Sequence, residues 1–137
     1  MKNGLVFILL VAVCSLNSCN KDEEEFVFKY AGEYTGEIIE HNEFGTGEIN
    51  DTTKAAGALV EPLEEGASTH YIKNIGEVFS FDGKEIQDNI ALETVVENDD
   101  THYTYYYTVI FKEDSLFFDK RWESIGENGY AYFKGKR

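Results

Sequence analysis

Cysteine is nearly absent from the chain, and both copies lie near its start. Of the 137 residues only Cys14 and Cys19 are cysteine, so residues 20–137 contain none. This long stretch therefore has no disulfide, no thiolate metal site and no cysteine nucleophile. A domain built from it must be held together by the packing of its core.

Basic residues are also scarce. The chain has 12 lysines and arginines against 26 aspartates and glutamates, and its formal net charge is −14. Such a surface repels the phosphates of nucleic acid and the headgroups of anionic lipids. We therefore expect no nucleic-acid partner and no phosphate-binding role. At 42% hydrophobic residues, the chain still has enough apolar side chains for a folded core.

The chain has no long hydrophobic run. The apolar segment Leu5–Val13 follows the basic Lys2. A helix of about ten residues rises roughly 15 Å, which is about half the hydrocarbon thickness of a bilayer. The segment is therefore too short for a permanent membrane span. Its layout is typical of a secretory signal peptide.

Residues 16–19, with the sequence Leu-Asn-Ser-Cys, resemble the lipobox of bacterial lipoproteins. The resemblance implies that residues 1–18 are removed as a signal peptide and that the Cys19 thiol carries a diacylglyceryl group. Each buried methylene of an acyl chain contributes about 0.8 kcal/mol, so two or three chains anchor a protein stably. The alternative is an ordinary signal peptide with an incidental cysteine. Removal of residues 1–18 leaves 119 residues, with 11 basic and 26 acidic side chains.

An acidic run follows the lipobox and contains one lysine: Lys21, Asp22, Glu23, Glu24 and Glu25. It resembles the export signal of Bacteroidota lipoproteins, in which a lysine and acids follow the modified cysteine. The resemblance implies a lipid-anchored protein of the outer membrane that faces the medium. The alternative is a solvated linker that holds a periplasm-facing domain off the membrane by charge repulsion. The chain then divides into a signal peptide (1–18), a lipidated cysteine with an acidic tether (19–25) and a folded domain (26–137).

From residue 26 onward, short alternating segments rich in aromatic and β-branched residues follow one another, without a long helical pattern. In the strongest segment Tyr103, Tyr105 and Tyr107 fall on one face with Val109 and Phe111. Roughly seven to nine such strands predict an all-β domain. Short turns favour a small antiparallel meander barrel, with a β-sandwich as the alternative.

Three local predictions concern turns and glycines. Asp82-Gly83 lies between two apolar runs and predicts a tight hairpin. Residues 42–68 form the least regular part, in which Asp51-Thr52-Thr53 could cap a short helix and Ala58–Val60 could form a brief strand. Gly36, within a predicted strand, should permit close approach or sharp coiling of the sheet.

The residues Gly32-Glu33-Tyr34, at the start of a strand, resemble the Gly-x-Trp opening of lipocalins and other calycins, with tyrosine in place of tryptophan. The resemblance implies that Tyr34 closes the floor of a barrel and that a basic side chain of the last strand packs over it. Lys134, Lys136 and Arg137 are the candidates for that side chain. The whole domain also resembles the small calycin-like lipoproteins of Bacteroidota.

Motifs for catalysis or for metal binding are missing. The three histidines, His41, His70 and His102, lie far apart and form no spaced metal-binding pair. The serines lack a glycine-flanked nucleophile turn. Carboxylates are abundant, which leaves a small hydrolase as a minor alternative. We expect no catalytic residue, no metal and no cofactor.

The aromatic residues are the best candidates for a binding site. Tyr103, Tyr105, Tyr107 and Trp122 could line a pocket or a platform for a small apolar ligand or a glycan. The alternative is that these rings belong to the core and to the surface of the sheet. The alternative function is that of a non-enzymatic interaction module, such as an accessory subunit or an enzyme inhibitor. It would use residues 42–68 or the acidic surface.

Overall fold

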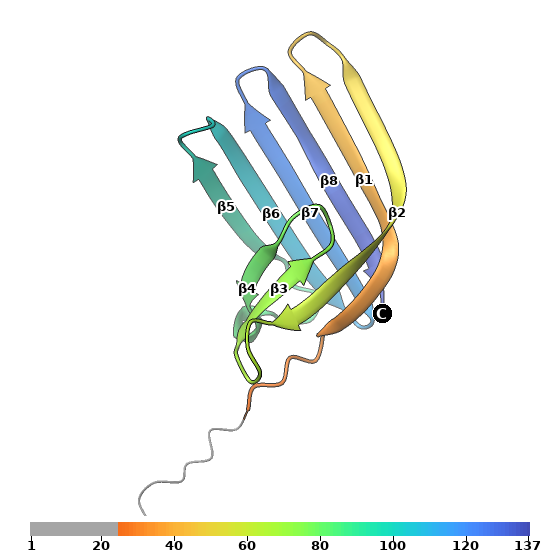
Figure 1. Ribbon diagram of the computed structural model, residues 1–137, viewed down its shortest axis with the longest axis vertical. Helices are drawn as coiled ribbons and strands as arrows, with labels where there is room; N and C mark the ends of the chain where they lie inside the picture. The colour runs from red at the N-terminus through yellow and green to blue at the C-terminus, as the bar shows by residue number, and fades with distance from the viewer. Residues whose placement is uncertain (1–24) are drawn as a thin grey trace, which may run out of the picture.

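The computed structural model describes residues 25–137, which form one antiparallel sheet of eight strands (Figure 1). The strands are β1 (Gly32–Phe44), β2 (Ile49–Pro62), β3 (Thr69–Lys73), β4 (Phe79–Asp82), β5 (Leu92–Asn98), β6 (Tyr103–Lys112), β7 (Ser115–Ser124) and β8 (Glu127–Lys136). A short 3-10 helix, η1 (Gly83–Glu85), follows β4. The predicted signal peptide, Cys19 and the tether residues up to Glu24 lie outside the described residues.

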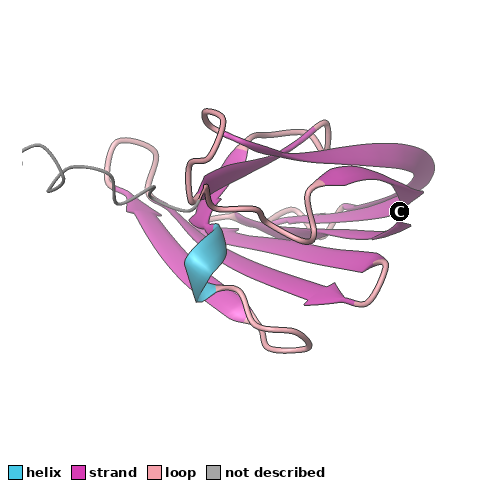
Figure 2. Cartoon of the chain, turned by 90° about the horizontal axis from the view of Figure 1, so that it is seen from below, coloured by secondary structure: helices cyan, strands magenta, loops and turns pink. Residues whose placement is uncertain are grey.

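The sheet is a meander with the spatial order β4-β3-β2-β1-β8-β7-β6-β5. Strands β1 and β8 pair in its middle and join two four-stranded halves, so that β4 and β5 are the edges. The sheet curls into a half-barrel that stays open between these edges (Figure 2). The all-β, antiparallel meander prediction is confirmed. The sandwich alternative is wrong, because one sheet contains all the strands of the described residues.

The core lies at one end of the half-barrel, where the β3–β4 hairpin folds across the inner side of the sheet (Figure 1). We call this inner side of the sheet the core face and the opposite side the outer face. The Phe79 ring of β4 lies 5.6 Å from that of Phe118 in β7. Burial of a large apolar side chain stabilises the fold by roughly 1.5–3 kcal/mol. The largest fully buried side chains are Tyr34, Phe111, Phe118, Phe133, Ile72, Leu116, His70, Val60 and Val109.

Glycines let the two central strands approach closely. Gly36 of β1 lies opposite Gly135 of β8. A Cβ on Gly36 would lie 1.9 Å from the carbonyl oxygen of Lys134, and a Cβ on Gly135 would lie 2.4 Å from Cζ of Phe133. Real Cβ atoms essentially never come so close to other atoms, so larger residues at these positions would force the strands apart. The expectation of close approach at Gly36 is confirmed.

The floor of the half-barrel joins the start of β1 to the end of the chain. Tyr34 is fully buried, and its hydroxyl donates a hydrogen bond to the carbonyl of Tyr30 at 2.7 Å. Arg137 donates from Nη1 to the carbonyls of Lys29 at 2.8 Å and Ala31 at 3.2 Å. Of the three basic candidates, Arg137 is therefore the one that reaches the floor. Lys134 instead points to the outer face, where its Nζ lies 5.7 Å from the Phe117 ring centroid.

The hairpin predicted at Asp82-Gly83 is wrong. Strand β4 ends at Asp82, whose carboxylate accepts a hydrogen bond from the Lys84 amide at 3.0 Å and caps η1. Gly83 serves packing instead of a turn. It is buried, and a Cβ there would lie only 3.0 Å from Cε1 of Phe26.

The short helix predicted after Asp51 is also wrong. Residues 49–62 are the continuous strand β2, and Thr53 pairs with Ile39 of β1. Antiparallel pairing along the whole of β1 overrides the local capping signal, and the β-branched Thr52 and Thr53 suit a strand. The brief strand predicted at Ala58–Val60 is confirmed as part of β2.

Candidate functional site

The four predicted binding residues lie together on the core face. Tyr103, Tyr105 and Tyr107 alternate along β6 and continue the face that buries Val109 and Phe111. Trp122 of β7 is the cross-strand partner of Tyr105. We call Tyr103, Tyr105, Tyr107 and Trp122 the aromatic platform. The period of two along β6 places the three tyrosines on one face, and the register with β7, which runs without a bulge, places Trp122 on the same face.

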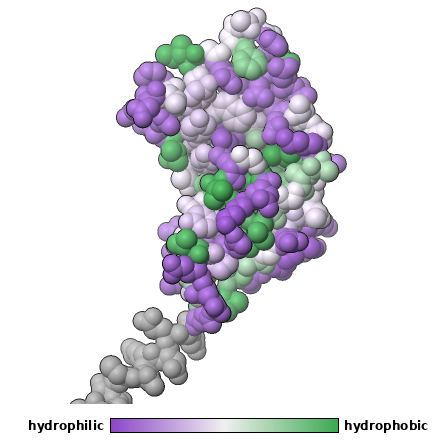
Figure 3. Space-filling model, viewed as in Figure 1, coloured by the Kyte–Doolittle hydropathy of each residue, from purple (hydrophilic) through white to green (hydrophobic). Residues whose placement is uncertain are grey.

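The platform is a ladder of nearly parallel rings. The ring centroids of Tyr103 and Tyr105 lie 5.8 Å apart with an interplanar angle of 17°, and those of Tyr105 and Tyr107 lie 6.3 Å apart at 26°. All four side chains are half-buried, beyond the end of the sheet that the core fills. In the view of Figure 3, the surface above the β3–β4 hairpin is pale, of intermediate hydropathy, and hydrophilic side chains border it.

Lys120 lies within the platform. Its Nζ is 4.9 Å from the ring centroid of Tyr105, 5.8 Å from that of Trp122 and 5.9 Å from that of Tyr107. It also donates a hydrogen bond to Oε2 of Glu77 at 2.9 Å. The ammonium group is thus held by one carboxylate and several aromatic rings, which fixes a charged donor at the centre of the site.

Glu77 reaches the platform from the connection between β3 and β4. The same Oε2 accepts a hydrogen bond from the Tyr107 hydroxyl at 3.3 Å. Burial raises the pKa of Tyr107 to about 12, and the negative charge of Glu77 adds to this rise. Tyr107 therefore remains a protonated hydrogen-bond donor at neutral pH.

At the far end of the ladder, the Tyr103 hydroxyl donates to Oε2 of Glu127 at 2.6 Å. This hydrogen bond is the main reason that the pKa of Tyr103 is raised. Two hydroxyls of the ladder are thus oriented by carboxylates, one from β8 and one from the β3–β4 connection. The platform combines ring faces with polar groups of fixed direction.

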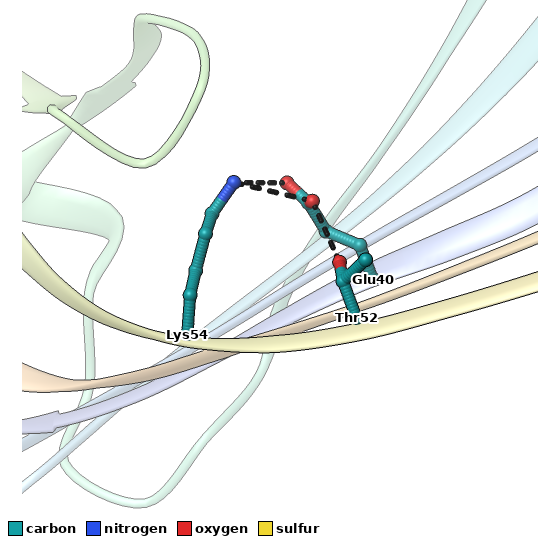
Figure 4. A network of polar contacts seen from close by, with 3 residues as sticks. All are labelled: Glu40, Thr52 and Lys54. Carbon is teal, nitrogen blue, oxygen red and sulfur yellow. Dashed lines mark hydrogen bonds and ion pairs between the residues drawn. The ribbon is translucent and has the colours of Figure 1, made fainter.

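A second polar group lies across the same face. Glu40 of β1 accepts hydrogen bonds from Oγ1 of Thr52 at 3.1 Å and from Nζ of Lys54 at 3.2 Å, both on β2 (Figure 4). The register places Glu40 opposite Ala131, and Ala131 opposite Lys120. Ala131 thus separates Glu40 from Lys120 on the core face.

Neither Lys120 nor Glu77 is predicted from the sequence as a site residue, for different reasons. Lys120 lies between Phe118 and Trp122 at the period of two that marks the core face, so its inward position was visible in the pattern. Glu77 lies in a connection without regular structure, and nothing in its sequence neighbourhood indicates a contact with a residue 43 positions away.

The histidines do not converge. His70 is buried in the core with Nδ1 near the carbonyl of Ser68, His41 lies on the outer face, and His102 is exposed before β6. Among residues 25–137, no three His, Cys, Asp or Glu side chains gather as a metal site. Over the same range, no helix is long and apolar enough to cross a membrane.

No protein-family model, curated protein or solved structure matches this chain. Its function must therefore be argued from the geometry of the site.

Proposed function

We propose that the protein is a lipid-anchored, cell-surface lipoprotein whose domain binds a neutral glycan on the aromatic platform. The observation that carries the proposal is the half-buried ladder of Tyr103, Tyr105 and Tyr107 beside Trp122, with Lys120 among the rings. Sugar rings offer C–H groups to aromatic faces and hydroxyls to polar side chains, and both kinds of partner are present here.

The arrangement favours a glycan over an apolar ligand. An apolar ligand binds best in an enclosed pocket, which buries most of its surface. The enclosed end of the half-barrel is occupied by its own side chains, among them Phe111, Phe118 and Phe133. The accessible part of the core face is aromatic and hydrogen-bonding instead, which suits a ligand that keeps contact with water.

The charges favour a neutral glycan over an anionic one. Lys120 is paired with Glu77, and Lys54 is paired with Glu40. Neither ammonium group is left to neutralise a sulfate or a uronate. The net charge of −14 adds a general repulsion against anionic ligands.

The position of the chain's N-terminal side sets the direction of the platform relative to the anchor. Residues 25–31 lead into β1 at the floor of the half-barrel (Figure 1). The ladder begins at Tyr103, at the opposite end of the sheet, where β6 starts after the turn from β5. An anchor at Cys19 would therefore leave the platform pointing away from the membrane.

The test is a glycan-binding measurement on the full lipoprotein in detergent. An array of neutral and anionic glycans identifies a ligand, and its affinity is measured by the fluorescence of Trp122, the single tryptophan. Tyr105→Ala should weaken binding about tenfold or more, equivalent to about 1.4 kcal/mol. Tyr106→Ala is the matched control, because Tyr106 lies on the same strand but on the outer face.

Three results would contradict the proposal. One is the absence of saturable binding to any glycan. Another is an equal loss of affinity in Tyr105→Ala and Tyr106→Ala. The third is saturable binding of an apolar dye that Tyr105→Ala weakens, without binding of any glycan, which would indicate an apolar ligand on the same platform.

A further inference from the structure

A line of exposed side chains crosses the outer face, on the side of the sheet away from the platform. The strand registers pair Val95 with Tyr106, Tyr106 with Arg121, Arg121 with Tyr130, and Tyr130 with His41. Each residue comes from a different strand, in the order β5, β6, β7, β8 and β1. We call these five residues the outer strip.

Three large side chains of the outer strip are exposed. Val95 is 58% exposed, Tyr106 38% and Tyr130 39%. The His41 ring stacks on Tyr130 with centroids 5.1 Å apart and an interplanar angle of 16°. Large apolar and aromatic side chains that adjoin on a surface commonly mark an interaction site. Tyrosine and arginine are also among the residues that carry most of the energy of protein interfaces.

The surface along the strip is hollowed on both sides of Arg121. One hollow of about 830 Å³ is lined by Tyr130, Tyr132 and His41, and another of about 510 Å³ by Val95 and Tyr106. Arg121 and Glu123 line both hollows. Two adjacent depressions with aromatic walls can receive protruding side chains of a partner, which a flat sheet surface cannot do.

Arg121 is held in place before any partner arrives. Its Nε and Nη2 donate to Oδ2 of Asp119 at 3.1 and 3.0 Å, although the side chain is 68% exposed. A guanidinium fixed in this way loses less conformational freedom when it becomes buried in an interface. Arg121 lies between Tyr106 and Tyr130 in the strand register.

Carboxylates border the strip on both sides. Side chains two positions apart on a strand share a face, so each strip residue has two neighbours on the outer face of its own strand. On β5 and β7 all of these neighbours are acidic. At the β1 end, Asp51 lies opposite His41 and contacts its Nδ1. The bordering carboxylates are Glu93, Glu97, Asp119, Glu123 and Asp51.

We propose that the outer strip is a docking surface for a basic protein. Side chains of the partner enter the hollows beside Tyr106 and Tyr130, and its lysines and arginines meet the bordering carboxylates. A second copy of this chain fits poorly, because it would bring like charges together at net −14 per chain. Nucleic acid is repelled for the same reason. The docking surface lies on the face opposite the aromatic platform, although Trp122 and Tyr107 also line the two hollows. Tyr105 lines neither hollow.

The test is photo-crosslinking with the full chain in its native host. Benzoylphenylalanine replaces Tyr106 or Tyr130 in the outer strip. In a control it replaces Phe117, which also lies on the outer face but pairs with Lys134 near the floor. The crosslinked protein is identified, purified and titrated against the native lipoprotein, Tyr130→Ala, Glu123→Lys and Tyr105→Ala.

The proposal predicts one basic protein that is crosslinked from both strip positions and not from position 117. Its affinity should fall about tenfold or more with Tyr130→Ala and with Glu123→Lys, should weaken with added salt, and should be unchanged by Tyr105→Ala. The proposal is overturned by crosslinks to a second copy, to an acidic protein or to no protein at all. It is also overturned when both strip variants keep native affinity. Loss of glycan binding in Tyr105→Ala tests the platform alone.

Discussion

Trp122 lies opposite Gly129 in the β7–β8 pair, and its indole ring occupies the space that a side chain at position 129 would need. A Cβ on Gly129 would lie 2.5 Å from Cζ2 of Trp122 and 2.3 Å from the carbonyl oxygen of His41. The glycine therefore allows the indole to lie over β8. An aromatic side chain that covers a cross-strand glycine also restores packing that the glycine lacks.

Gly129→Ala should disturb both the fold and the platform. The new methyl group clashes with a backbone atom and with the indole, so we expect a loss of about 1–3 kcal/mol in the free energy of unfolding. Gly57→Ala is the matched control, because a Cβ at this strand glycine would meet only the Tyr34 carbonyl at an ordinary 3.6 Å. Urea unfolding followed by Trp122 fluorescence measures both. Equal stabilities of the two variants would contradict this role of Gly129.

How far the sequence predicts the structure depends on whether the relevant contact is periodic. Alternation along β6 places Tyr103, Tyr105 and Tyr107 on one face, and the unbroken register with β7 places Trp122 opposite Tyr105 on the same face. Where a local signal competes with tertiary packing, prediction from the sequence fails. Gly83 looks like a turn glycine, but it is required by the rings of Phe26 and Phe28, which approach it from an earlier part of the chain.

The same limit applies to the candidate site. The aromatic part of the platform could be predicted, whereas its polar centre could not be predicted in full, because Glu77 reaches Lys120 from a connection outside regular structure. The outer strip could not be predicted from the sequence. Its members lie on five strands, and only the register between the strands brings them into one line.

Arg137→Ala should loosen the floor of the half-barrel. It removes two hydrogen bonds from a charged donor to the carbonyls of Lys29 and Ala31, for an expected loss of about 1–2 kcal/mol. Lys136→Ala is the control, since Lys136 is the exposed neighbour on β8. Hydrogen exchange of residues 28–34 should speed up in the first variant alone. Unchanged protection of this segment in Arg137→Ala would show that the two contacts do not hold the floor.

Alkaline pH should weaken the fold through Tyr107. Burial raises its folded-state pKa from 10.0 to about 12, so the unfolded chain loses the phenol proton before the folded chain does. The stability that this shift supplies is complete below pH 10 and falls as the pH rises towards 12. Tyr107→Phe should therefore lose less stability over this interval than the native protein.

The matched control is Tyr106→Phe, which changes the exposed tyrosine directly before Tyr107. The stability of this variant should depend on pH as that of the native protein does. Chemical unfolding at pH 9, 10 and 11 compares the three proteins. Parallel pH profiles for Tyr107→Phe and the native protein would mean that the pKa of Tyr107 is not raised in the folded state.

Lipidation of Cys19 and the role of residues 21–25 can be tested in cells. If the Cys19 thiol carries lipid, Cys19→Ser should abolish the mature, membrane-bound form, because serine cannot accept the diacylglyceryl group. Persistence of that form in fractionated cells would show that residues 16–19 are not a lipobox. Alanine at Lys21, Asp22, Glu23, Glu24 and Glu25 should keep the lipid but remove sensitivity to protease added outside the cells. Continued sensitivity would mean that this run is only a spacer.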